Sequence, residues 1–264
     1  MHITIIADSK RHDMLAAELI KLGHAVTIFR DCKEISQKIV GDMIILPIPS
    51  FTKDDLLNLK GATNTVSKDE FSKRISDESF IISCNCEFEG KRFIDINKFE
   101  PFVSMNAVPS AEGAISLAMQ HSDIALFESR VLIIGYGRIG RIVANRLDAF
   151  NAKITVVARK PKDRFAAVSE GFASIDYDRL DEHLGKFDFI FQTVPYPVLN
   201  AERLRKVNGL IIELSSKGIG SDLNFAKANG INLIYAPGIP EKYSGITAGK
   251  ILIDSIKSII FELE

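Results

Sequence analysis

The chain has 264 residues, of which 46 % are hydrophobic, and this is enough apolar material for two domains with their own cores. Its 33 basic and 34 acidic residues are scattered along the sequence, which argues against a nucleic acid or an anionic membrane as partner and favours a small-molecule ligand. The sequence has no apolar run of membrane-spanning length and opens without a leader pattern, so we expect a cytoplasmic protein.

The three cysteines, Cys32, Cys84 and Cys86, lack the number and spacing of a disulfide framework. They are not followed by a second cysteine pair or by histidines at ligand spacing. We therefore expect free thiols in a reducing compartment and no bound metal.

The first third of the chain has the pattern of a small α/β domain. Two short apolar runs flank a helical stretch near the start, which predicts a β-α-β unit, and three more apolar runs follow. The predicted strands are residues 3–7, 25–29, 43–46, 80–83 and 102–105. We expect this domain to span residues 1–110 and to face the substrate.

A helix that is apolar nearly all round is predicted from Ala111 to Ser129, and we interpret it as the connector between two domains. Alternating strands and helices follow and predict a mostly parallel sheet over residues 111–247. The strands of this sheet are expected at residues 131–134, 154–157, 189–193, 210–214 and 233–236. The tail, residues 248–264, is a helix that either caps the second domain or completes the first, and its periodicity allows both.

The segment Gly135-Tyr136-Gly137-Arg138-Ile139-Gly140 is a G-x-G-x-x-G motif between a predicted strand and a predicted helix. Gly135 permits the tight turn, Gly137 lets a pyrophosphate approach the backbone, and Gly140 lets the helix pack close to the sheet. The free N–H groups of the helix start suit the phosphates. We predict an α/β fold with two Rossmann-like or flavodoxin-like parallel-sheet domains, the second an NAD(P)-binding Rossmann domain.

The choice of cofactor depends on the end of the next strand, where NAD enzymes place an acid that binds the ribose 2′-hydroxyl. This chain has Ala158-Arg159-Lys160 there. Arg159 can bind a 2′-phosphate with two parallel hydrogen bonds, and Lys160 adds a second positive charge. These residues favour NADP(H), with two solvated loop cations as the alternative.

Ligands of open α/β sheets bind beyond the carboxyl ends of the strands. This rule places Thr193-Val194-Pro195 and Ser215-Ser216-Lys217 near the nicotinamide end of the cofactor. The corresponding turn of the first domain, Ala7 to Arg11, has no glycine fingerprint, so we expect it to face the substrate and not a second nucleotide.

Histidine placement argues against one common class of dehydrogenase. The five histidines are His2, His12, His24, His121 and His183, and 2-hydroxy acid dehydrogenases need a later one as acid/base. At the predicted start of the connector helix, we expect Ser110 as N-cap and Glu112 in the first turn, with Asn106 just before them. Capping and ligand binding both remain open for these three residues.

Several motifs in order resemble one family, the A subunit of dipicolinate synthase, the enzyme of spore-forming bacteria that makes pyridine-2,6-dicarboxylate. The motifs are residues 106–113, residues 120–123, the glycine turn with Ala158-Arg159, Thr193-Val194-Pro195, residues 213–217, residues 236–240 and residues 247–252. Together they cover most of the chain after residue 105.

The resemblance implies an NADP-linked oxidation of dihydrodipicolinate to dipicolinate, a branch of the lysine pathway used in sporulation, with a smaller flavoprotein-like B subunit. Aromatisation drives such a reaction, so the protein mainly holds the ring against the nicotinamide and accepts a proton. Our catalytic candidates are Glu112 and Lys217, and our candidates for the substrate carboxylates are Arg11, Asn106, Ser110, Ser216 and Thr247. Our cofactor candidates are Gly135, Tyr136, Gly137, Arg138, Ile139, Gly140, Arg159, Lys160, Thr193, Val194, Pro195 and Ser215.

Two alternatives to this function stay open, because the first domain has Ala7-Asp8-Ser9 where family members have a Gly-Gly-Asp-type turn. The chain could be an NADP-dependent reductase of another small keto or hydroxy acid. It could also be a non-catalytic, nucleotide-binding partner of a larger enzyme. The apolar terminal helix could in addition serve a homo-oligomer.

Overall fold

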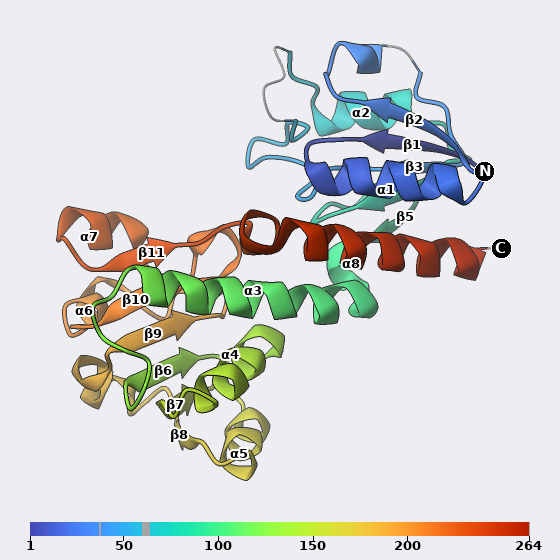
Figure 1. The fold of residues 1–264 in the computed structure, drawn as a ribbon. Helices are drawn as coiled ribbons and strands as arrows, with labels where there is room; N and C mark the ends of the chain where they lie inside the picture. Colours follow the sequence, from blue (N-terminus) through green and yellow to red (C-terminus); the bar gives the residue numbers. More distant parts are fainter. Residues whose placement is uncertain (37, 60–63, 264) are drawn as a thin grey trace. The chain divides into compact units, whose positions relative to one another are not determined.

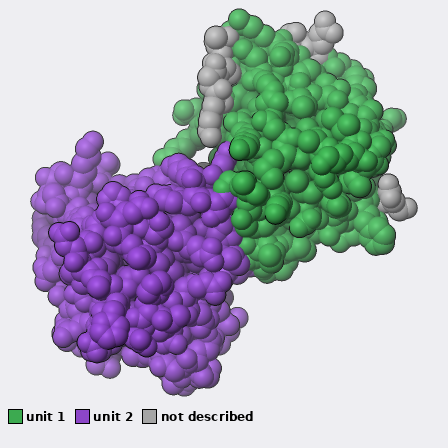
Figure 2. Space-filling model, in the orientation of Figure 1, with its two compact units in different colours: residues 1–106, 245–264 green, residues 107–244 purple. Residues whose placement is uncertain are grey.

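The computed structural model describes residues 1–36, 38–59 and 64–263 and divides the chain into two compact units. Unit 1 comprises residues 1–106 and 245–264, and unit 2 comprises residues 107–244 (Figure 2). Each unit has its own parallel sheet (Figure 1). The predicted α/β class with two parallel-sheet domains is confirmed.

Unit 1 is built on a five-stranded parallel sheet in the order β2-β1-β3-β4-β5. Its strands are β1 (His2–Ile6), β2 (Ala25–Phe29), β3 (Met43–Ile45), β4 (Phe80–Ser83) and β5 (Arg92–Asp95). Helices α1 (Lys10–Lys21) and α2 (Lys68–Arg74) belong to this unit. The order reverses between β1 and β3, which is where sheets of this kind bind ligands at the carboxyl ends of their strands.

The apolar tail belongs to unit 1. Helix α8 (Ile239–Leu263) buries Leu252, Ile256 and Ile259 in one core with Leu15 and Leu19 of α1. The helical spacing of the tail predicted an apolar face, and the structure shows that this face completes the first domain.

Unit 2 is built on a six-stranded parallel sheet in the order β11-β10-β9-β6-β7-β8. Its strands are β6 (Arg130–Ile134), β7 (Lys153–Val157), β8 (Ala173–Ile175), β9 (Phe189–Gln192), β10 (Leu210–Glu213) and β11 (Leu233–Tyr235). Its helices include α4 (Arg138–Asp148), α5 (Pro161–Ser169), α6 (Ala201–Leu204) and α7 (Leu223–Ala228). Two buried apolar clusters, one containing Ile133 and Val156 and the other Leu132 and Val157, follow the alternation of strand side chains between the two faces of the sheet.

The connector helix both begins and ends earlier than predicted, so residues 121–129 are not part of it. Helix α3 runs from Glu100 to Gln120 and has Pro109 in its interior. The strand expected at residues 102–105 is therefore wrong, and these residues form the first turns of α3. Phe102 is only 1 % exposed and packs in the core of unit 1. Burial of such a side chain stabilises the helical turns before Pro109, although the local sequence predicts that the helix starts only after that residue.

Candidate functional site

The glycine turn between β6 and α4 has the shape that its sequence predicted. Gly135 has a φ of +96°, and a Cβ atom there would lie 2.4 Å from Cγ1 of Val194. A Cβ atom on Gly140 would lie 2.2 Å from the carbonyl oxygen of Gly135. At Gly137, by contrast, a Cβ atom would meet no atom within 4 Å. The turn is thus closed on its inner side and open at Gly137, which fits a pyrophosphate on the backbone at the start of α4.

The side chain of Tyr136 anchors this turn to the rest of unit 2. Its hydroxyl donates to Oε2 of Glu170 at 2.8 Å, and the guanidinium of Arg141 lies 5.0 Å from its ring centroid. Nε of Arg141 also donates to the carbonyl oxygen of Tyr136 at 3.3 Å. Burial and the bond with Glu170 raise the pKa of Tyr136, so the phenol stays protonated and remains a donor.

Exposed cations follow the end of β7. Arg159 and Lys160 are both exposed, and Lys160 is the N-cap residue of α5. Nη1 of Arg164, in the first turns of α5, donates to the carbonyl oxygens of Ala158 at 2.8 Å and of Arg159 at 3.0 Å. The side chain of Arg164 therefore holds the backbone that carries Arg159.

The turns after β9 and β10 are held by hydrogen bonds to the same sheet. Oγ1 of Thr193 donates to the carbonyl oxygen of Ile134 at 2.8 Å, which fixes the turn after β9 beside the glycine turn. After β10, Ser215 is buried and Ser216 is exposed. The side chain of Lys217 lies outside the described part of the structure.

Two buried polar residues of these strands were not among the predicted site residues. Glu213 ends β10 and Gln192 ends β9, and both are 0 % exposed. A carboxylate inside the apolar run from Leu210 to Leu214 is the sequence signal that points to Glu213, because an ionisable group is rarely fully buried without a partner.

In unit 1, Arg11 lies at the reversal point of the sheet. Its side chain is 6 % exposed, and Nη2 donates to the carbonyl oxygen of Ile48, in the turn after β3, at 3.2 Å. A Cβ atom on Gly249 would lie 3.7 Å from Cα of Arg11, so α1 and this part of α8 are in close contact. Thr247, two residues before Gly249, is exposed.

The start of α1 also has a carboxylate–imidazole pair that was not predicted from the sequence, with Asp8 just before the N-cap residue and His12 in the helix. Oδ1 of Asp8 lies 2.8 Å from Nδ1 of His12, and their side chains are 2 % and 0 % exposed. Oγ of Ser9 is 3.2 Å from the same nitrogen. The i, i+4 spacing of Asp8 and His12 at a helix start is the signal that could have found this pair.

The expected capping roles in the connector helix are wrong. Ser110 and Glu112 lie in the middle of α3, ten or more residues after its first residue, so Ser110 is not an N-cap and Glu112 is not in a first turn. Ser110 is buried, and Oε1 of Glu112 lies 3.5 Å from Nη2 of Arg146 on α4. Asn106 lies on the same helix, before Pro109.

The three cysteines are free and buried. Burial raises the pKa of Cys84 to about 12, so this thiol stays protonated and is unreactive at neutral pH. Among the described residues there is no group of three or more His, Cys, Asp or Glu side chains that could hold a metal ion. No helix in the described part of the chain is both long and apolar enough to cross a membrane.

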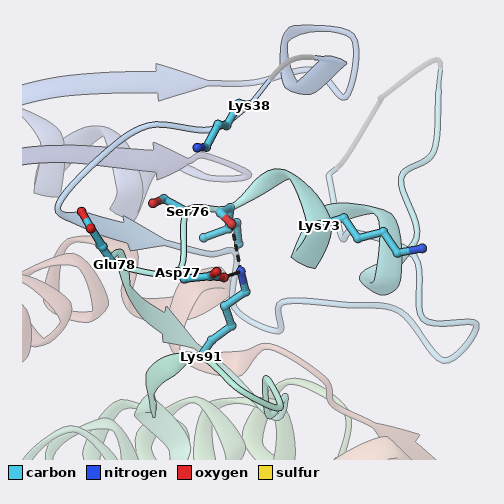
Figure 3. A pocket seen from close by; sticks show the side chains of 7 residues that line it. Lys38, Lys73, Ser76, Asp77, Glu78 and Lys91 are labelled. Carbon is cyan, nitrogen blue, oxygen red and sulfur yellow. Dashed lines mark hydrogen bonds and ion pairs between the residues drawn. The ribbon is translucent and has the colours of Figure 1, made fainter.

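A hollow of about 460 Å³ lies on unit 1, lined by Lys38, Lys73, Ile75, Ser76, Asp77, Glu78 and Lys91 (Figure 3). Nζ of Lys91 donates to Asp77 at 2.5 Å and to the carbonyl oxygen of Ile75 at 2.9 Å. Residues 75–79 precede β4, so this hollow lies at the amino end of that strand. Because ligands of parallel sheets bind at the opposite edge, we do not assign the hollow to the functional site.

Known proteins resemble the chain in both sequence and fold. Residues 110–210 match the family model described as "D-isomer specific 2-hydroxyacid dehydrogenase, NAD binding domain". The A subunit of dipicolinate synthase from Bacillus subtilis (strain 168) is 28 % identical over 234 residues, which cover 84 % of this chain and 79 % of that protein. The expected resemblance is confirmed.

The solved structures that match show the same fold over nearly the whole chain. The A subunit of dipicolinate synthase from Bacillus halodurans matches with a TM-score of 0.86 and 24 % identity, over 98 % of this chain and 97 % of that one. Its counterpart from Bacillus subtilis matches with a TM-score of 0.84 and 24 % identity, over 99 % and 96 %. The family model, whose matched residues all lie in unit 2, and the similarity to the Bacillus subtilis subunit together support an NAD(P)-dependent oxidoreductase with its nicotinamide-cofactor domain in unit 2.

Proposed function

We propose that the chain oxidises dihydrodipicolinate to dipicolinate with NADP⁺ as oxidant. The observation that carries this proposal is the sequence similarity to the A subunit of dipicolinate synthase, which extends over 84 % of the chain and so includes both units. Because that relative is one subunit of its enzyme, we infer that a second, flavoprotein-like B subunit is the partner of this chain. We also infer a cytoplasmic role in sporulation.

The preference for NADP(H) follows from charge at the end of β7. A carboxylate there would repel a 2′-phosphate, whereas Arg159 and Lys160 offer two exposed cations. Arg164 supports the arrangement, since its bonds to the carbonyl oxygens of Ala158 and Arg159 fix the backbone from which the Arg159 side chain extends. A guanidinium on a fixed backbone loses less entropy when it binds a phosphate.

Two further sets of residues in unit 2 bind the pyrophosphate and the nicotinamide half of the dinucleotide. The N–H groups from Gly135 to Gly140 hold the pyrophosphate, with Arg138 and Ile139 in the first turn of α4. The nicotinamide half is surrounded by Thr193, Val194, Pro195 and Ser215. When NADP⁺ is bound, it supplies the acceptor for a hydride.

The substrate has two carboxylates, which need cations and neutral donors. We propose Arg11, Asn106, Ser110, Ser216 and Thr247 for this role. Loss of a hydride and a proton leaves the aromatic ring, so the protein must also accept one proton from a ring carbon. Glu112 and Lys217 are our candidates for that transfer.

The cofactor part of the proposal is tested by measuring the Kd of NADPH and of NADH through the fluorescence of the reduced nicotinamide. We expect NADPH to bind more tightly, and Arg159→Ala to remove that preference while NADH binding stays unchanged. Lys162→Ala, which removes an exposed cation of α5 outside the proposed site, is the matched control. Equal binding of both dinucleotides by the unmodified chain would contradict the assignment.

One observation favours a second candidate, an NADP-dependent reductase of another small keto or hydroxy acid. The Asp8–His12 pair is the kind of group that such enzymes use as acid/base, and Nε2 of His12 is buried without a hydrogen-bond partner among the described residues. Oxidation of NADPH by a series of small 2-keto acids would support this candidate, provided that His12→Ala abolishes it.

A further inference from the structure

Glu213 is a fully buried carboxylate at the carboxyl end of β10. An ionised carboxylate is stable in such a place only when hydrogen bonds replace its water. Here Oε1 accepts from the backbone N–H of Ser215 at 2.8 Å, and Oε2 accepts a short hydrogen bond from the hydroxyl of Ser221. Both donors lie in the turn that follows β10, so Glu213 binds the beginning and the end of this turn.

Gln192, also fully buried, makes the equivalent contacts for the turn after β9. It is paired with Glu213 in the register of the two strands, which lie side by side (Figure 1). Its Oε1 accepts from the N–H of Val194 at 3.1 Å, and its Nε2 donates to the carbonyl oxygen of Gly220 at 2.9 Å. One side chain therefore contacts both turns.

Gly220 is the point at which these contacts converge. Its N–H donates to Oγ of Ser215 at 2.9 Å, and its carbonyl oxygen accepts from the N–H of Leu199 at 3.0 Å as well as from Gln192. A Cβ atom on Gly220 would lie 2.7 Å from Cγ of Gln192. Residues 193–199 and 215–221 thus share one buried polar network with Glu213 as its charged member.

The strand order indicates which half of a bound dinucleotide this network would lie next to. The strand order of unit 2 reverses between β6 and β9, and a dinucleotide crosses the carboxyl ends at that point. The ribose that carries the 2′-hydroxyl or 2′-phosphate would lie beside β7, so the nicotinamide half would lie over β9 and β10.

We infer that Glu213 is a positioning residue, whose ionised carboxylate holds the turns after β9 and β10 in the geometry that binds the nicotinamide half of the cofactor. The inference rests on the nicotinamide-cofactor site of unit 2 and is independent of the substrate. A residue that served stability alone would affect both halves of the cofactor equally. A positioning role affects the nicotinamide half and leaves the adenosine half unchanged.

A pH dependence follows from the same geometry. Burial raises the pKa of Glu213, while the hydrogen bonds from Ser215 and Ser221 oppose that change. Among the described residues, Tyr235 is an ionisable neighbour of Glu213, because the two residues are paired in the register of β10 and β11. As the pH falls through the raised pKa, the carboxyl group gains a proton and becomes a weaker acceptor for Ser215, so nicotinamide binding weakens.

The experiment compares two probes on Glu213→Gln and on the unmodified chain. The first probe is NADPH or NADH, whichever the unmodified chain binds, and the second is its adenosine fragment, 2′,5′-ADP or ADP. We expect the Kd of the dinucleotide to rise about tenfold, because a charged acceptor becomes neutral, and the Kd of the fragment to stay the same. The fall in dinucleotide affinity as the pH is lowered should disappear in this variant.

Asp222→Asn is the matched control, since it changes a neighbouring carboxylate that caps α7 through the N–H of Phe225 at 2.9 Å. It should leave both Kd values unchanged. If Glu213→Gln does not fold, Ser221→Ala removes one bond of the same network and should show the same selectivity for the dinucleotide.

Equal weakening of both probes, or no weakening of either, would overturn the positioning role while leaving the function intact. An unmodified chain that binds neither dinucleotide would contradict the cofactor function itself, and this inference with it.

Discussion

The two units place their candidate ligand-binding groups at the carboxyl ends of parallel strands, but these groups come from different parts of the chain. In unit 2 the candidate binding group is the backbone, and close approach of a phosphate requires glycines at fixed positions. In unit 1 the corresponding turn carries side chains, with Arg11 and the Asp8–His12 pair buried at the start of α1. Backbone sites leave a pattern in the sequence that side-chain sites do not.

The largest expected effect comes from closing the space on which the glycine turn depends. In Gly140→Ala the new Cβ atom would lie 2.2 Å from a backbone oxygen, so β6 and α4 must separate. We expect unit 2 to lose about 3 kcal/mol of stability, as for an overpacked core, and cofactor binding to become undetectable. Urea unfolding and NADPH fluorescence measure the two effects.

Gly137→Ala is the control for this prediction, because its Cβ atom would meet open space in the protein. Stability should change little, while cofactor affinity falls because the methyl group occupies the path of the pyrophosphate. If both variants behaved alike, the distinction between packing and ligand glycines would fail.

A similarly large effect on stability is expected in unit 1. His12→Ala removes the main partner of the buried carboxylate of Asp8 and should lower the free energy of unfolding by about 3 kcal/mol at neutral pH. Asp13→Asn, which breaks the exposed ion pair with Arg30, should cost less than about 1 kcal/mol. Denaturant unfolding of both variants provides the comparison.

The same pair has a predicted pH dependence. Burial raises the pKa of Asp8, but the contacts with His12, Ser9 and Arg11 outweigh it, and the net pKa is lowered. The carboxylate therefore contributes stability above its unfolded pKa, and this contribution is lost as the pH falls through the folded pKa. In Asp8→Asn, the free energy of unfolding should therefore fall less steeply as the pH is lowered than it does in the unmodified chain. The same steepness in both proteins would rule out this contribution.

Arg159→Ala tests whether the side chains of unit 2 add specificity to its backbone site. We expect NADPH affinity to fall by about 2 kcal/mol, the magnitude of a charge-assisted hydrogen bond, with no change for NADH. Equilibrium binding of both dinucleotides measures this, and equal loss for both would mean that Arg159 acts on the fold of the loop.

The smallest expected effect is that of Tyr136→Phe, which removes the hydroxyl that donates to Glu170. The ring and its contact with Arg141 remain, so unit 2 should lose about 1 kcal/mol. Thermal unfolding can resolve this difference. A loss of cofactor binding without a loss of stability would instead show that the hydroxyl contacts the ligand.

Much of the fold could be predicted because buried strands and amphipathic helices have distinct periodicities. Strands β5 and β8 were missed, since Arg92–Asp95 and Ala173–Ile175 are short and partly polar. The start of α3 was placed too late because Pro109 and Ser110 have the pattern of a helix entry, whereas burial of Phe102 extends the helix to Glu100.

Only the parts of the candidate site that are local in sequence could be predicted. The glycine turn and the cations after β7 are local in sequence, so their positions could be inferred from one segment. The Glu213 network joins residues 28 positions apart, from Gln192 to Gly220, and depends on strand pairing that no short segment reveals. Asp8 and His12 are close in sequence, but their burial depends on the packing of α1.

The proposed function is tested most directly by hydride transfer from dihydrodipicolinate, with NADP⁺ or NAD⁺ and with or without the partner protein. We predict formation of NADPH together with dipicolinate, and a much slower reaction with NAD⁺. A chain that binds NADPH tightly, yet reduces no NADP⁺ with dihydrodipicolinate even when its partner is present, would contradict the proposed function.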